Sequence, residues 1–252
     1  MDWRCPKSEK NWPMRVNWNN IKLGFLGMVV IALYGFADYR SDQKTIDDIT
    51  IKFLGDNNLY LTEASVNKLL IQNYGTVKNR PKEQLVLNTI DEVLRSNDMV
   101  KNAQVYLTVN GELISKIVQR KPIGRVEGVS KFYLDDLGER MPLSKHHSAR
   151  VPIITGKITG KTLEDAYVIL NYINEDDFLR KNVIGIHIEE EGKYQLKFRL
   201  ENFVVNLGGV ENLDEKFKNF MAFYVKATKD KSLEKYAVVS LEFSNQVVCT
   251  KI

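Results

Sequence analysis

Hydrophobic and polar positions divide the chain into one apolar run near its start and a longer series of short periodic segments. The run extends from Leu23 to Ala37 and contains no charged residue. It is shorter than the roughly 20 residues usual for a membrane-spanning helix, but Trp18 and Tyr39 flank it as interface anchors. At about 1.5 Å per residue, the distance between these two aromatic residues matches the thickness of a bilayer's hydrocarbon core. The pattern therefore predicts a transmembrane helix at 23–39.

The charges on either side of this run predict its direction. Basic residues precede the run and acidic residues follow it: Arg4, Lys7, Lys10, Arg15 and Lys22 before, Asp38, Asp42, Asp47 and Asp48 after. By the positive-inside bias, residues 1–22 are expected in the cytoplasm and the chain after residue 40 outside it. The alternative is a cleaved signal peptide, because Gly35-Phe36-Ala37 offers small residues where a signal peptidase requires them. Both interpretations export the same domains.

The next region, residues 40–122, begins with a polar connector and continues as a small module. Five segments with strand or helix periodicity follow in the order β-α-α-β-β: Ile49 to Leu54, Thr62 to Gly75, Pro81 or Lys82 to Leu94, Val100 to Val109 and Glu112 to Arg120. Thr62 is expected to cap the first helix and Gly75 to stop it. Pro81 suits the first position of the second helix. Asn110-Gly111 is the dipeptide most typical of a two-residue hairpin loop.

Beyond Pro122, at residues 123–252, short strands are punctuated by Gly and Pro. Three strands, a helix and three further strands are expected: Phe132 to Asp135, Met141 to Leu143, Val151 to Thr155, Thr162 to Asn174, Val183 to Glu189, Tyr194 to Leu200 and Phe203 to Leu207. A long helix then presents one apolar face, made by Leu213, Phe217, Phe220, Met221 and Tyr224. The end of the chain predicts a strand with Val239, Leu241 and Phe243 facing inward, a turn near Asn245 and a final short strand.

Charge and cysteine content exclude several classes of protein. The net charge of +4 is small for 252 residues, and basic residues alternate with acidic ones instead of forming a stripe that binds phosphates. Nucleic-acid binding is therefore not expected. Cys5 and Cys249 lie almost a full chain apart, with neither a CxxC pair nor a nearby histidine. Because a membrane would separate them, each is expected to be a lone thiol.

Candidate chemistry is equally sparse. The motifs of hydrolases, metalloproteases and nucleotide-binding enzymes, G-x-S-x-G, H-E-x-x-H and the Walker or G-x-G-x-x-G patterns, do not occur. His146-His147 is expected on a surface loop, Asp135-Asp136 in a glycine turn, and Glu189 to Glu191 at a hairpin tip. We therefore expect no catalytic residue, no metal ligand, no cofactor and no small-molecule substrate.

Three stretches of the chain resemble a known family. A membrane helix followed directly by β-α-α-β-β, ending in Arg120, Lys121 and Pro122, resembles the POTRA module that opens the exported part of FtsQ/DivIB cell division proteins. The second region contributes YLDDLGERMPLS followed by VPIITG, and FVVNLGGVENLDEKFKNF, which are similar to the family's β-rich second domain. The resemblance implies an α+β fold, with one transmembrane helix, a POTRA-like domain and a mixed α/β domain that ends in a β-sheet edge.

The resemblance also implies a function, because family members are non-enzymatic, essential scaffolds of the divisome. They link cytoplasmic and extracytoplasmic division proteins during septum formation, as single-pass type II proteins of the bacterial inner membrane enriched at the division septum. Their C-terminal sheet edge captures the small bitopic proteins FtsB and FtsL. The corresponding residues here are Phe243, Val247, Val248, Cys249, Thr250 and Lys251. The alternative is a POTRA-bearing envelope export or assembly factor, although no long barrel of alternating strands follows the POTRA-like part.

Overall fold

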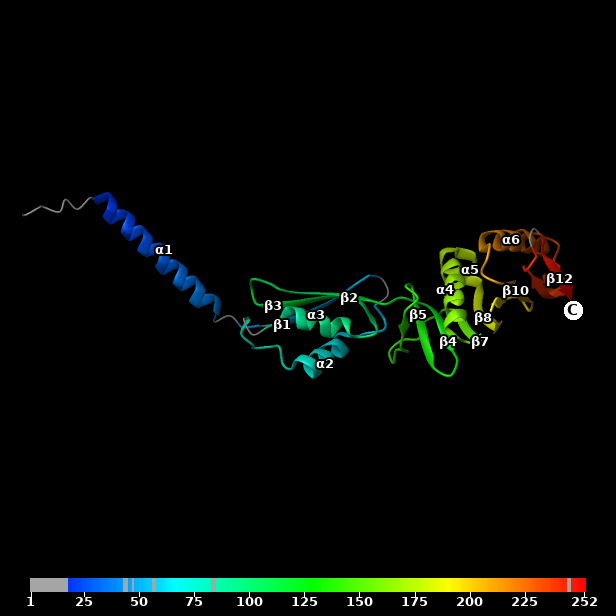
Figure 1. The fold of residues 1–252 in the computed structure, drawn as a ribbon, viewed down its shortest axis with the longest axis horizontal. Coiled ribbons are helices and arrows are strands. Elements are labelled where there is room, and N and C mark those ends of the chain that lie inside the picture. The colour runs from blue at the N-terminus through cyan, green and yellow to red at the C-terminus, as the bar shows by residue number, and fades with distance from the viewer. Residues whose placement is uncertain (1–17, 43–44, 47, 56–57, 83–84, 244–245) are drawn as a thin grey trace, which may run out of the picture.

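The computed structural model describes residues 18–42, 45–46, 48–55, 58–82, 85–243 and 246–252. Figure 1 shows three parts in chain order: a single helix α1, a small module containing β1 to β3, and a larger sheet domain that begins with β4. The predicted α+β fold, with an apolar helix, β-α-α-β-β and a mixed α/β domain, is confirmed. Most of the expected cytoplasmic segment, including Cys5, lies outside the described residues.

Helix α1, Trp18–Asp42, contains the apolar run, and its side chains from Ile21 to Tyr39 are exposed. Ile21–Tyr39 has 19 residues and a mean hydropathy of 1.7, so it is long and apolar enough to cross a membrane. An apolar helix without protein contacts is stable only where another apolar medium surrounds it. A signal sequence near the N-terminus has the same length and composition, so the helix alone does not distinguish an anchor from a cleaved segment.

The small module is a three-stranded sheet packed against two helices. Its elements are β1 (Asp48–Leu54), α2 (Glu63–Tyr74), α3 (Leu87–Arg95), β2 (Val100–Leu107) and β3 (Glu112–Gln119). β3 lies in the middle, parallel to β1 and antiparallel to β2. Thr62 caps α2 as predicted, because its hydroxyl accepts a hydrogen bond from the Ser65 N–H. Ile90 and Leu94 of α3 join Ile117 of β3 in the buried core.

Two predictions for this module are wrong. Helix α3 begins at Leu87 rather than at Pro81 or Lys82, because Pro81 forms an isolated bridge with Thr45 and Leu85 packs into the core ahead of the helix. This tertiary packing overrides the preference of proline for a first helical position. The hairpin loop has three residues, 109–111, since the Thr108 N–H still donates to the Glu112 carbonyl at 2.9 Å.

The sheet domain contains nine strands in the order β12-β11-β10-β9-β8-β7-β4-β5-β6. Its elements are β4 (Pro122–Glu127), β5 (Lys131–Asp135), β6 (Arg140–Met141), β7 (Ile153–Gly156), α4 (Gly160–Glu175), α5 (Asp177–Asn182), β8 (Val183–Glu190), β9 (Lys193–Phe198), β10 (Val204–Gly208), α6 (Leu213–Lys229), β11 (Tyr236–Ser240) and β12 (Val248–Lys251). α4 and α5 connect the parallel pair β7 and β8, and α6 connects the parallel pair β10 and β11. Neither β4 nor α5 was predicted from the sequence.

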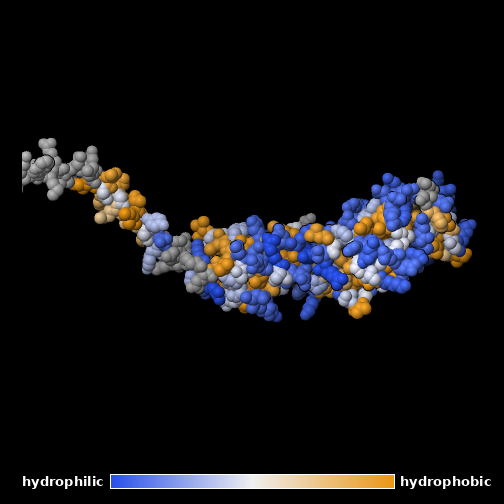
Figure 2. Space-filling model, in the orientation of Figure 1, coloured by the Kyte–Doolittle hydropathy of each residue, from blue (hydrophilic) through white to orange (hydrophobic). Residues whose placement is uncertain are grey.

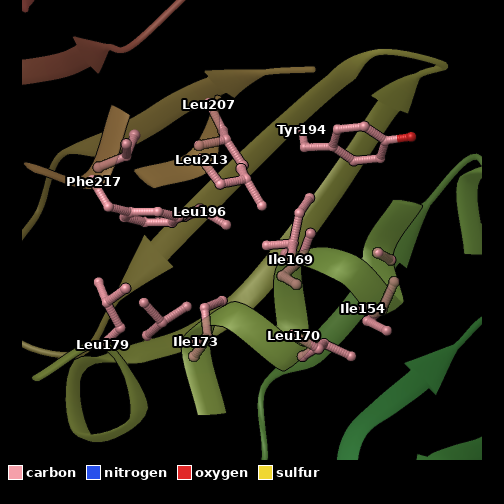
Figure 3. Close-up of a cluster of buried hydrophobic side chains, with 14 of the residues drawn as sticks. Ile154, Ile169, Leu170, Ile173, Leu179, Tyr194, Leu196, Leu207, Leu213 and Phe217 are labelled. Atoms are coloured by element: carbon pink, nitrogen blue, oxygen red, sulfur yellow. The ribbon is translucent and has the colours of Figure 1, made fainter. Parts of the chain in front are cut away.

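One face of this sheet holds the main core, and the other faces solvent except at β5 and β6, where it packs against the small module. Figure 3 shows Ile169 of α4 between Leu196 and Tyr194 of β9 on one side and Leu170, which lies toward Ile154 of β7, on the other. Along the strands, buried residues alternate with exposed ones such as Lys193 and Lys197 on β9. This alternation is typical of a sheet covered by helices on a single face.

Several contacts join the small module to the sheet domain. Tyr60, which precedes α2, packs with Tyr133 and Met141 of the sheet domain in a separate buried cluster. The Tyr60 carbonyl accepts a hydrogen bond from the Ser144 hydroxyl at 2.9 Å. Arg120, at the end of the small module, donates to the buried Asp135 carboxylate at 2.7 Å. The junction therefore combines apolar packing with a buried ion pair.

Candidate functional site

The C-terminal strand β12 lies at one end of the nine-stranded sheet. It pairs with β11 in antiparallel register, from Ser240↔Val248 to Tyr236↔Lys251, and the order of strands places no further strand beyond it among the described residues. In Figure 1 it is the red arrow beside the C-terminus. An edge strand presents backbone N–H and C=O groups to solvent, where they are free to pair with another chain.

The register determines which residues of β12 present these groups. The Ile252 N–H donates to the Lys235 carbonyl at 3.0 Å, so the backbone of Ile252 faces the neighbouring strand. Because successive residues of an antiparallel strand alternate in direction, Thr250 and Val248 also face β11. The backbone groups of Cys249 and Lys251 therefore point away from the sheet, where a partner strand would add.

Side chains on this edge divide between the two faces of the sheet. Cys249 and the preceding Val247 pack against the main core, and burial raises the pKa of the Cys249 thiol. Val248 is 42% exposed and Thr250 is exposed on the opposite, open face. Figure 2 shows hydrophobic surface at this end of the molecule, where Val248 and the 87% exposed Ile252 lie. The edge thus combines open main-chain groups with exposed apolar side chains.

Phe243 is not in the position that the alternation predicted. The strand ends at Ser240, and Phe243 lies beyond it with half of its surface exposed, whereas Val239 and Leu241 are buried as expected. The chain leaves the sheet after Ser240, so the inward alternation of β11 does not extend to Phe243. The expected turn at Asn245 lies outside the described residues.

The structure adds residues of α6 to this region that the sequence did not single out. Phe243 lines a cavity of about 30 Å³ together with Asn212, which precedes α6, and with Glu215 and Asn219 of the first two turns of that helix. Lys216 of the same turn donates to the Gly209 carbonyl at 2.8 Å, and burial lowers its pKa. The spacing of the three polar residues is helical, and this spacing was the only signal in the sequence that they share a face.

The other candidate residues are distributed over the junction and the surface. Asp135 does form the predicted turn, because its carboxylate accepts hydrogen bonds from the Leu137 and Glu139 N–H groups, but it also binds Arg120. His147 lies edge-on to the Tyr60 ring at 5.5 Å. Within the described residues, no group of three or more His, Cys, Asp and Glu side chains is arranged to hold a metal ion.

The described residues thus form an apolar helix long enough to cross a membrane, a small β-α-α-β-β module and a sheet whose C-terminal strand has an open edge. Residues 48–118 match a POTRA-like domain. Residues 121–250, just over half of the chain, match the family described as FtsQ/DivIB, C-terminal related. The chain belongs to the FtsQ/DivIB family, which indicates a role in cell division. A search of the curated proteins found no match.

Family membership agrees with the helix at the start of the chain. The FtsQ/DivIB family is a non-catalytic family of division scaffolds, and an apolar N-terminal helix fits a protein anchored in the inner membrane.

Proposed function

We propose that this protein is a non-enzymatic scaffold of the divisome that binds FtsB-like and FtsL-like proteins through β12. One observation carries the proposal: in this family member β12 is an edge strand whose outer side is open among the described residues, with the backbone groups of Cys249 and Lys251 directed outward. A partner strand that adds here extends the nine-stranded sheet by one. The protein then links division proteins across the membrane without carrying out a reaction.

In this proposal, main-chain and side-chain groups have separate roles. Hydrogen bonds to Cys249 and Lys251 give affinity that depends little on sequence. Val248 and Thr250, on the open face, contact alternate side chains of the added strand and select its register. Phe243 and the polar start of α6 extend the contact beyond the strand, because they lie next to the end of β11. A helix retained at 23–39 holds this edge on the outer side of the membrane.

A pair of proline substitutions tests the proposal. Proline lacks a backbone donor, so Lys251→Pro removes an outward N–H and leaves the bonds to β11 intact. Thr250→Pro is the matched control, since Thr250 is equally exposed but its N–H faces β11. A buried acceptor left unpaired costs about 1–3 kcal/mol, so Lys251→Pro is expected to weaken co-purification with the FtsB-like partner about tenfold. Its melting temperature is expected to match that of the unmodified chain.

The control variants separate the backbone effect from other losses. Thr250→Pro is expected to lower the melting temperature, because it removes a bond within the sheet. Lys251→Ala keeps the N–H and is expected to bind much more tightly than Lys251→Pro. If Lys251→Pro binds the partner as well as the unmodified chain does, strand addition at β12 is wrong.

Two further experiments distinguish a membrane-anchored division scaffold from an export factor and from a cleaved exported protein. A fluorescent fusion is expected at midcell, whereas uniform envelope fluorescence contradicts a division scaffold. Mass spectrometry is expected to show that the mature protein retains residues 1–37. A mature chain that begins at Asp38 contradicts the membrane anchor.

A further inference from the structure

We propose that the cleft between the small module and the sheet domain binds an extended, acidic and aliphatic segment of a second envelope protein. The cleft has a volume of about 380 Å³. Its walls come from the loop before α2, the connection between β3 and β4, the loop at 147–152, and helices α4 and α5. It shares no lining residue with the β12 edge, so this inference stands apart from the proposed function.

The charged residues that line the cleft are all basic. Lys121 and Arg150 line it and are exposed, and neither forms an ion pair with any other described residue. Arg180 lines it as well, but its guanidinium pairs with Asp177. No Asp or Glu lines the cleft among the described residues. Two cations without a counter-charge beside an open cleft favour a ligand that carries carboxylates.

One wall of the cleft offers main-chain groups as well. The segment from Ala149 to Pro152 lies outside the strands, and its ends are fixed: the Ala149 N–H donates to the Tyr133 hydroxyl at 3.1 Å, and the Pro152 carbonyl accepts from the Arg125 N–H at 2.9 Å. Between them, the N–H and C=O of Arg150 and Val151 have no hydrogen-bond partner within the described part of the chain. Backbone groups held in place without a partner are typical of a wall along which an extended peptide binds.

Apolar side chains complete the cleft. Leu59 is 50% exposed at its rim, and Val151 and Pro152 are partly exposed along its wall. Below them lies the buried core, represented by Ile123. Aliphatic side chains of a ligand would cover this surface while its carboxylates reach the basic rim.

The basic residues, the unpaired backbone groups and the apolar side chains together favour a peptide over a small anion or a second copy of the chain. A small anion would use the two cations but would leave the backbone groups and the apolar rim unsatisfied. A second copy of the chain would have to bring a matching acidic segment, but its two exposed runs of three acidic residues, Glu175 to Asp177 and Glu189 to Glu191, are held at the α4–α5 junction and at the β8–β9 hairpin, so neither is a separate extended segment. An extended segment with alternating acidic and aliphatic residues satisfies all three features at once.

Selection from an unbiased peptide library tests the proposal. The full-length chain in nanodiscs is exposed to a random twelve-residue library displayed on phage, after depletion on empty nanodiscs. The enriched peptides are expected to contain Asp or Glu together with Leu, Ile or Val. Their binding is expected to fall at least about tenfold in Lys121→Glu/Arg150→Glu, because both reversed charges repel the ligand carboxylates. The control Lys197→Glu/Lys218→Glu changes the net charge equally at exposed sites away from the cleft and is expected to bind normally.

Hydrogen exchange then locates the bound peptide. Protection of the Arg150 and Val151 amides, with unchanged exchange at 248–251, supports the cleft and distinguishes it from the β12 edge. The proposal is overturned if no peptide is enriched, if the enriched peptides lack acidic residues, or if they bind the Lys121→Glu/Arg150→Glu variant as tightly as the unmodified chain. It is also overturned if the enriched peptides instead protect the amides of β12, or if acetate at the same carboxylate concentration protects the Arg150 and Val151 amides as the peptides do.

Discussion

The ion pair between Asp135 and Arg120 connects the small module to the sheet domain, and Asp135→Ala measures its contribution to the junction. Asp135 is fully buried, and one carboxylate oxygen accepts from Arg120 at 2.7 Å. The other accepts from the Leu137 and Glu139 N–H groups at 2.9 and 2.8 Å. The substitution removes all of these hydrogen bonds and leaves the Arg120 guanidinium, 22% exposed, without its counter-charge.

The expected loss follows from this burial. Removing one partner of a buried ion pair costs about 3–5 kcal/mol, and partial exposure of Arg120 to water places Asp135→Ala near the lower end, at about 3 kcal/mol. For a chain of this size each kcal/mol lowers the melting temperature by roughly 2–4 °C, so a decrease of about 6–12 °C is expected. Asp135→Asn keeps an acceptor for the turn amides and is expected to lose about half as much. Circular dichroism is the suitable signal, because Trp3, Trp12 and Trp18 all precede the small module and the sheet domain.

Asp177→Ala is the matched control for this measurement. Asp177 also pairs with an arginine, but its side chain is 74% exposed, so its loss is expected to change the melting temperature by less than about 2 °C. Arg120→Ala/Asp135→Ala is expected to cost less than the sum of the two single substitutions, because they remove the same interaction. If Asp135→Ala lowers the melting temperature no more than the Asp177→Ala control does, the ion pair between Asp135 and Arg120 does not stabilise the junction.

Three other outcomes are expected from single substitutions. Gly156→Ala is expected to lower the melting temperature strongly, since an added Cβ would lie 2.0 Å from the Ile188 carbonyl oxygen at a φ of 101°; an unchanged melt contradicts this. Burial and the hydrogen bond to Glu201 raise the pKa of Tyr224 from 10.0 to about 12. The unfolded chain loses that proton first, so stability is expected to fall as pH rises through this window, and less steeply in Tyr224→Phe; equal slopes in pH-dependent melts contradict this. Phe243→Ala is expected to weaken partner pull-down while costing less than about 1 kcal/mol of stability, because the ring is half exposed; a large loss of stability contradicts its placement.

Elements with a strong local signal were predictable from the sequence. Thr62 and Gly75 delimit α2 as expected, and the alternation of Tyr194, Leu196 and Phe198 identifies the buried side of β9. The strand β4 forms a hairpin with the adjacent β5, but it was missed because Gly124 interrupts its apolar pattern and its second partner, the parallel β7, is distant in the sequence. That glycine is required by tertiary packing, since a Cβ there would lie 2.3 Å from Leu170 of α4.

The candidate site was predictable only in part, because its geometry also depends on contacts between distant parts of the chain. A short strand after a turn indicated an edge, and β12 does lie at the end of the sheet. Which residues face outward depends on the register with β11, including the irregularity between Tyr236 and Val238, and a single sequence does not reveal this. Phe243 was assigned inward because alternation was extended past the point where β11 leaves the sheet at Ser240. The cleft between the modules involves loops and helix ends that meet only in the folded chain.

Residue-resolved hydrogen exchange on the full-length chain, with and without the proposed FtsB-like partner, tests strand addition at β12 most directly. In the free chain, the amides of Val248, Thr250 and Ile252 are expected to exchange slowly, because they face β11, and those of Cys249 and Lys251 rapidly. The partner is expected to protect Cys249 and Lys251 while leaving the opposite sheet edge at β6 unchanged. A stable complex in which Cys249 and Lys251 still exchange as rapidly as in the free chain would contradict the account.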